Sequence, residues 1–194
     1  MVSNWFFKIS GTALILSGAA YAIDTALDAY LPASSPGLGA LVPLLGLLGF
    51  PGFWLSLKTG PRDGLALGAL VLGMLGLAGL VIVTFLNNRL FPDLPPDTRM
   101  QILTAIRPEL LVIGLTFLAS ALCLLPVALR SDRRNALGAV LYALGAIPVS
   151  LPPLMPPQLV NAGGLAVAAG LILWGIGLIA GAEARSAAAV PARA

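Results

Sequence analysis

The sequence predicts an all-α bundle of about six transmembrane helices, and three observations lead to that fold class. Apolar residues make up 58% of the 194-residue chain and charged residues only 10%, against roughly a quarter in soluble domains. Uncharged stretches long enough to cross a bilayer recur along the chain, and basic residues collect in alternate connections between them. Because a soluble fold could not cover so much apolar surface, we expect a polytopic integral membrane protein.

The uncharged stretches set the individual spans, since a helix needs about 20 apolar residues to cross the hydrocarbon. Residues 135–182 are uncharged over a length that suits two spans, and the prolines within 150–158 mark the turn between them. The expected spans are 8–27, 38–57, 65–86, 109–129, 135–151 and 160–181. They form a single transmembrane domain over residues 1–182, followed by a short cytoplasmic tail over 183–194 that we expect to be disordered.

The first span has an alternative interpretation as a cleaved signal peptide. Ala20-Tyr21-Ala22 resembles a small-x-small cleavage site, but the single Lys8 makes a poor basic segment before the apolar region. An aromatic group over residues 5–7 suits the membrane interface instead. We therefore favour a retained helix, and a mature chain that begins at Ile23 would contradict it.

Loop charge predicts that both termini are cytoplasmic, in a bacterial plasma (inner) membrane. With the N-terminus inside, the cytoplasmic side holds eight basic residues: Lys8, Lys58, Arg62, Arg130, Arg133, Arg134, Arg185 and Arg193. The outer side holds three: Arg89, Arg99 and Arg107. This asymmetry follows the positive-inside rule. In the longest outer loop, residues 98–107 have the apolar spacing of a short amphipathic helix with a capping box at Thr98–Gln101.

The strongest candidate for a functional site is the pair Asp24 and Asp28. At positions i and i+4 they share one helical face near the outer end of the first span. Carboxylates inside a membrane are costly and often mark an ion or substrate path. The simpler interpretation, which we favour from sequence, is that both residues define the water-exposed helix end.

A second candidate lies in the second span, where Gly49, Pro51 and Gly52 are close together. Glycine and proline near mid-membrane can break a helix and free carbonyl groups that bind an ion, as in secondary transporters. A simple proline kink, with its backbone groups satisfied by neighbouring helices, is the favoured alternative.

Small residues at four-residue spacing predict faces where helices pack closely. The candidate packing residues are Gly18, Ala22, Gly64, Gly68, Gly177 and Gly181. Packing within one chain explains such faces, and contact with another membrane protein or a second copy is the alternative.

Reactive chemistry finds little support in the sequence. The chain has no histidine and a single cysteine, Cys123, in an apolar run, so we expect no cofactor, no metal and no catalytic residue. No phosphate-binding glycine motif occurs, and the basic residues form no patch with aromatic residues, so neither nucleotide nor nucleic acid is an expected partner.

Two function classes remain. The first is an accessory, assembly or structural membrane component that acts through helix packing, and the absence of reactive groups favours it. The alternative is a small transporter or permease for a lipid-like or uncharged solute, which needs a polar path through the spans. The feature that separates them is whether Asp24 and Asp28 face an interior cavity or the outer water.

Overall fold

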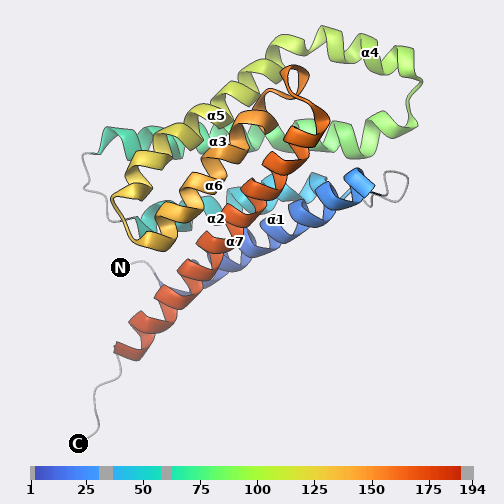
Figure 1. Ribbon diagram of the computed structural model, residues 1–194. Coiled ribbons are helices and arrows are strands. Elements are labelled where there is room, and N and C mark those ends of the chain that lie inside the picture. The colour runs from blue at the N-terminus through green and yellow to red at the C-terminus, as the bar shows by residue number, and fades with distance from the viewer. Residues whose placement is uncertain (1–2, 31–36, 58–62, 189–194) are drawn as a thin grey trace, which may run out of the picture.

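A computed structural model describes residues 3–30, 37–57 and 63–188 (Figure 1). Within these residues the chain is all helical, with seven α-helices and no strand. The α-helices are α1 (Asn4–Tyr30), α2 (Val42–Ser56), α3 (Gly64–Phe85), α4 (Pro96–Ala105), α5 (Arg107–Leu129), α6 (Arg133–Ser150) and α7 (Pro157–Ala188). The short helical turns are η2 (Leu38–Leu41), η3 (Leu86–Leu90), η4 (Phe91–Asp93) and η5 (Pro152–Leu154). This architecture is that of the predicted all-α bundle.

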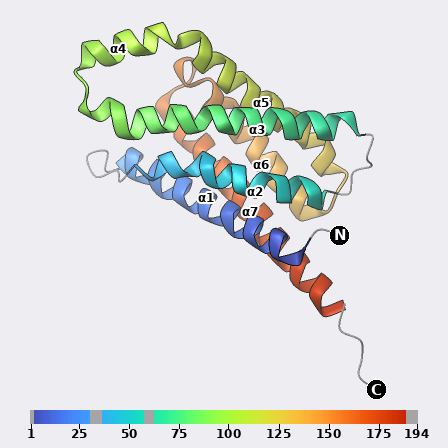
Figure 2. The ribbon, with the colours of Figure 1, turned by 180° about the vertical axis from the view of Figure 1, so that it is seen from behind.

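Six of the helices form a closed ring. Around it, α1 packs on α2, α2 on α3, α3 on α5, α5 on α6, α6 on α7, and α7 on α1 again. Figures 1 and 2 show the ring from two sides, with α4 standing apart as the connection between α3 and α5. Because every ring helix has two neighbours, each presents one face to a common interior.

Two helices, α3 and α6, each begin directly after an aspartate that caps them. Asp63 caps α3 by accepting hydrogen bonds from the backbone amides of Leu65 and Ala66. Asp132 caps α6 in the same way, through the amides of Arg134 and Asn135. A side-chain oxygen at this position satisfies amides that have no partner within the helix.

Five helical stretches among the described residues are long and apolar enough to cross a membrane: Asn4–Tyr30, Leu38–Ser56, Gly64–Asp93, Arg107–Leu129 and Pro157–Ala187. The sixth ring helix, α6, has 18 residues but begins with two arginines and is the least apolar of the six. Large apolar side chains are exposed on the outside of the ring, among them Leu48 (62%), Leu75 (61%) and Leu144 (61%). An outer surface of this kind suits lipid.

Glycines let the ring helices approach at their crossings. A methyl group on Gly11 of α1 would lie 2.7 Å from the carbonyl oxygen of Gly175 in α7. On Gly138 of α6 it would lie 2.5 Å from the Trp174 indole nitrogen, and on Gly76 of α3 it would lie 2.9 Å from the Phe117 backbone. A side chain at any of these positions would force the helices apart.

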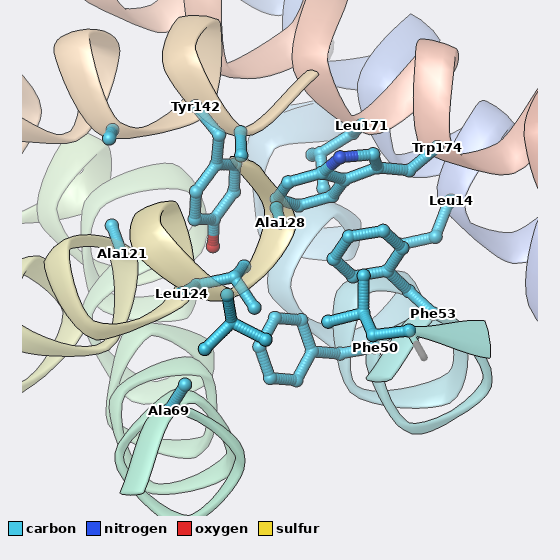
Figure 3. Packing of buried hydrophobic residues seen from close by; sticks show 14 of the residues in the cluster. Leu14, Phe50, Phe53, Ala69, Ala121, Leu124, Ala128, Tyr142, Leu171 and Trp174 are labelled. Atoms are coloured by element: carbon cyan, nitrogen blue, oxygen red, sulfur yellow. The ribbon is translucent and has the colours of Figure 1, made fainter. Parts of the chain in front are cut away.

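Aromatic side chains fill part of the interior of the ring (Figure 3). The ring of Phe53 stacks on Trp174 with centroids 4.0 Å apart, and the rings of Tyr142 and Trp174 are tilted to each other with centroids 4.8 Å apart. Trp174 is fully buried, and its indole nitrogen donates to the Asn135 carbonyl at 3.3 Å. This part of the interior is densely packed.

Two local predictions need correction. The connecting helix α4 begins at Pro96, so Thr98 lies inside it and forms no capping box. The helix α7 continues to Ala188, so Glu183–Ala188 is helical instead of disordered, because these residues follow the last span without a helix breaker. Residues 189–194 of the predicted tail lie outside the described residues, as do Lys58, Arg62 and Arg193.

Candidate functional site

The ring encloses a cavity of about 700 Å³, which adjoins the aromatic cluster at Tyr142. All six ring helices line it, together with η2, η3, η4 and η5. The polar side chains that α1 contributes are Ser17, Tyr21, Asp24, Thr25 and Asp28. Those from other elements are Thr84, Asn87, Asn88, Tyr142 and Asn161. Cavities of this volume are typical of small-molecule sites.

Asp24 is the one charged residue that is buried among the described residues, with 6% of its surface exposed. Its carboxylate lies against Gly39 of η2, where a methyl group would collide with it. The Asn88 amide nitrogen would lie 3.1 Å from the same methyl position, so the two polar groups are gathered beside Gly39. Since η2 leads directly into α2, Gly39 lies at the N-terminal end of one continuous helical stretch. The helix dipole is positive at this end and favours a negative charge there.

Asp28 lies one turn further along α1, at the mouth of the cavity. Its side chain is exposed, as are those of Asn87, Pro92 and Pro152, which also line the cavity. The two carboxylates therefore line one continuous space, one inside it and one at its rim. Since α1 continues to Tyr30, the interpretation that both residues define the helix end is wrong for Asp24.

Beside Asp24, the cavity wall contains a π-helical turn, η3, at the end of α3. Its Asn88 side chain donates a hydrogen bond to the Thr84 carbonyl at 2.8 Å. Gly37 has a φ of 66° and lies close to this turn. A methyl group on Gly37 would lie 3.3 Å from the Asn88 carbonyl oxygen, so glycine lets η2 approach η3. Single π-helical turns are frequent at functional sites. This turn could not be predicted from the sequence, because nothing in Leu86–Leu90 distinguishes a π turn from the α-helix before it.

The floor of the cavity is apolar and aromatic. Phe50, Phe117 and Tyr142 line it from three different helices, and the rings of Phe117 and Tyr142 meet edge to face at 5.5 Å. Figure 3 shows Phe50 and Tyr142 approaching from opposite sides, with Leu124 between them. Through Tyr142, the floor adjoins the packed aromatic cluster at Trp174.

The Gly49–Pro51–Gly52 segment does not interrupt its helix. The helix α2 runs without a break from Val42 to Ser56, with Pro51 inside it. A methyl group on Gly49 would lie 2.5 Å from the Leu14 side chain, and one on Gly52 would collide with Ser10. These glycines therefore make room for α1, and the predicted helix break is wrong because packing against α1 keeps α2 continuous.

The candidate packing residues have different surroundings. A methyl group on Gly18 would lie 2.6 Å from the Ala168 carbonyl oxygen, so α1 and α7 approach closely there. Ala22, one turn later on α1, is half-buried. Around Gly64 and Gly68, the described residues offer no atom within 4 Å of a methyl group. A methyl group on Gly177 would lie 3.4 Å from the Arg134 side chain. A methyl group on Gly181 would lie 3.7 Å from the side chain of Arg185, which belongs to the same helix.

Among the described residues, no three His, Cys, Asp or Glu side chains come together as ligands for a metal ion. Cys123 is a half-buried free cysteine packed against the core. No protein-family model matches the chain, and comparisons with curated proteins and with solved structures give no match either.

Proposed function

We propose that this chain is a small membrane transporter that takes up its solute in the central cavity. The observation that carries this proposal is the placement of Asp24, a buried carboxylate that lines a cavity of about 700 Å³ inside the ring. An ionisable side chain inside a membrane bundle is costly and usually marks a substrate or ion path. The transporter, the alternative in the sequence analysis, thereby becomes the preferred function.

The membrane placement that goes with this proposal has six spans and both termini in the cytoplasm of a bacterial cell. The start of α1 and the end of α7 lie together, since the Asn4 side chain donates to the Ser186 hydroxyl at 2.9 Å. The beginning of α6 reaches the same end, where the Arg134 side chain lies 3.4 Å from the position that a methyl group on Gly177 would take. Lys8, Arg134 and Arg185 therefore share one end of the bundle, and the positive-inside rule makes that end cytoplasmic. A reporter that is active only outside the cell should be silent when fused to the C-terminus.

The cavity geometry supports alternating access. In this orientation the mouth, at Asp28 and Asn87, faces the outside, and the aromatic floor closes the cytoplasmic side. Transporters of many folds open a central site first to one face and then to the other. The state described here corresponds to the outward-open one.

An accessory or assembly role is the second candidate, and the open surroundings of Gly64 and Gly68 favour it. Small residues that pack on nothing within the described chain leave a face on which another helix could lie. Reproducible co-purification of one membrane protein after gentle extraction would support this role, and its loss on Gly68→Leu would place the contact.

Thiol labelling tests the transport proposal, because the chain has one native cysteine to remove. In a Cys123→Ser background, a cysteine is placed at Thr84 in the cavity wall, or at Ala121 in the packed core as a control. A membrane-impermeant maleimide is applied to right-side-out and to inside-out vesicles. The transport proposal requires that Thr84→Cys is labelled from both faces and that Ala121→Cys is not. Labelling of Thr84→Cys from the outer face alone would support a binding site but refute transport.

A further inference from the structure

We propose that the cavity binds an organic cation with an apolar body, such as a protonated amine or a quaternary ammonium or phosphonium ion, with Asp24 as its counter-charge. This inference rests on the proposed function, because it names the substrate class of that site. Three properties of the cavity carry it: its charge, its size and its aromatic floor.

The described lining is negative, with two carboxylates and no lysine or arginine. The chain as a whole has a net charge of +3, so the negative lining is a local property. All the arginines and lysines of the ring helices lie near helix ends, outside the cavity. A cavity with charges of one sign and low-dielectric walls concentrates ions of the opposite sign and repels anions.

The size and the lining favour an organic cation over a metal ion. A calcium or magnesium ion needs about six oxygen ligands at roughly 2.0–2.6 Å, whereas the cavity measures about 700 Å³ and most of its lining is apolar. Leu14, Leu77 and Val167 are among these apolar residues and would contact the body of an organic ligand. The ligand that matches is amphipathic, with one charged group near Asp24 and an apolar remainder towards the floor.

The aromatic floor adds a second interaction that favours a cation. Tyr21 precedes Asp24 by one turn on α1 and lines the same space, as do Phe117 and Tyr142. The face of an aromatic ring attracts a cation, and quaternary ammonium ligands are commonly recognised by aromatic rings. An anion of the same shape would meet neither favourable interaction.

A pair of ions with the same shape and opposite charge gives the sharpest test. Binding of tetraphenylphosphonium and of tetraphenylborate is measured by equilibrium dialysis on the full chain in lipid nanodiscs, with empty nanodiscs as the reference for partition into lipid. We expect saturable binding of tetraphenylphosphonium above the reference and none of tetraphenylborate. Equal binding of both ions, binding of the borate alone, or no saturable binding of either would overturn the proposal.

Variants then test whether Asp24 supplies the negative charge that binds the cation. Asp24→Asn keeps the shape of the side chain against Gly39 and should lower the affinity for tetraphenylphosphonium at least tenfold. Asp24→Glu keeps the charge and should retain binding, which distinguishes lost charge from lost folding. Asp97→Asn on α4 removes an exposed carboxylate outside the cavity and serves as the matched control, with unchanged affinity. An Asp24→Asn variant that binds as tightly as the wild type would overturn the role of Asp24.

The cation-binding experiment and the thiol-labelling experiment can fail independently of each other. If Thr84→Cys is labelled from both faces but no cation binds, transport stands and the substrate class is wrong. If the cation binds but labelling occurs from one face only, the site is correct and the transport proposal fails.

Discussion

The crossing of α1 and α7 at Gly18 gives a quantitative test of the bundle. In Gly18→Ala, the added methyl group would lie 2.6 Å from the Ala168 carbonyl oxygen and 2.7 Å from the Ile172 side chain. Since ordinary contacts lie at about 3.5–4.0 Å, the two helices would have to separate by roughly 1 Å. Such overpacking costs about 1–3 kcal/mol, partly offset by the better helix propensity of alanine, which contributes up to about 1 kcal/mol. We expect a net loss of about 1–2 kcal/mol.

Gly68→Ala is the matched control, because the described residues leave the space around Gly68 open. It gains the same helix propensity without a clash and should unfold at the wild-type temperature or slightly above it. For a chain of this length, 1 kcal/mol corresponds to about 2–4 °C in melting temperature, so Gly18→Ala should melt about 2–8 °C lower. The assay is thermal unfolding of the purified protein in detergent, followed by size-exclusion chromatography. Equal melting temperatures for the two variants would refute the close α1–α7 crossing.

Three further predictions follow from the same structure. Trp174→Ala should destabilise the protein by about 3–5 kcal/mol, because it empties a fully buried site, whereas Trp5→Ala, at a position 73% exposed, should have little effect in the same thermal assay. Asp132→Ala should cost about 1 kcal/mol by removing the α6 cap, and Asp132→Asn should restore most of it, as measured by melting temperature. Intact mass of the membrane-extracted protein should include α1, since that helix lines the cavity; a mature chain that begins at Ile23 would open the ring and contradict the proposed site.

The sequence predicted the helices well where length and charge determine them. Uncharged stretches longer than a span and a proline-rich turn at 150–158 leave few alternatives, and the structure has η5 at that turn. The end of α1 was harder to predict, because two aspartates and a tyrosine are also usual at a helix terminus. The structure extends α1 to Tyr30, and contact with η2 provides the reason: Asp24 lies against Gly39 instead of water.

The candidate site could be predicted only in part. Asp24 and Asp28 stood out because a carboxylate in an apolar span is rare. Asn88, Tyr142 and Asn161 did not, since each is a single polar residue in a different helix and only the closure of the ring brings them together. Their signal is weak: Asn88 and Asn161 lie at the edges of apolar stretches, as polar residues at helix termini do, and Tyr142 lies in the middle of α6, where a tyrosine is also usual in a packed core.

The distribution of leucine and polar side chains over the bundle argues that the cavity is kept open at a cost in stability. Leucines cover the outer face while Thr84 and Asn161 line the interior at one end, and the other end is filled by Trp174 and its neighbours. Filling an interior space usually stabilises a protein by about 0.5–2 kcal/mol, often with loss of function. Asn161→Leu should therefore raise the melting temperature and weaken binding of tetraphenylphosphonium. A variant that is less stable and binds tetraphenylphosphonium as before would show that Asn161 serves packing and takes no part in binding.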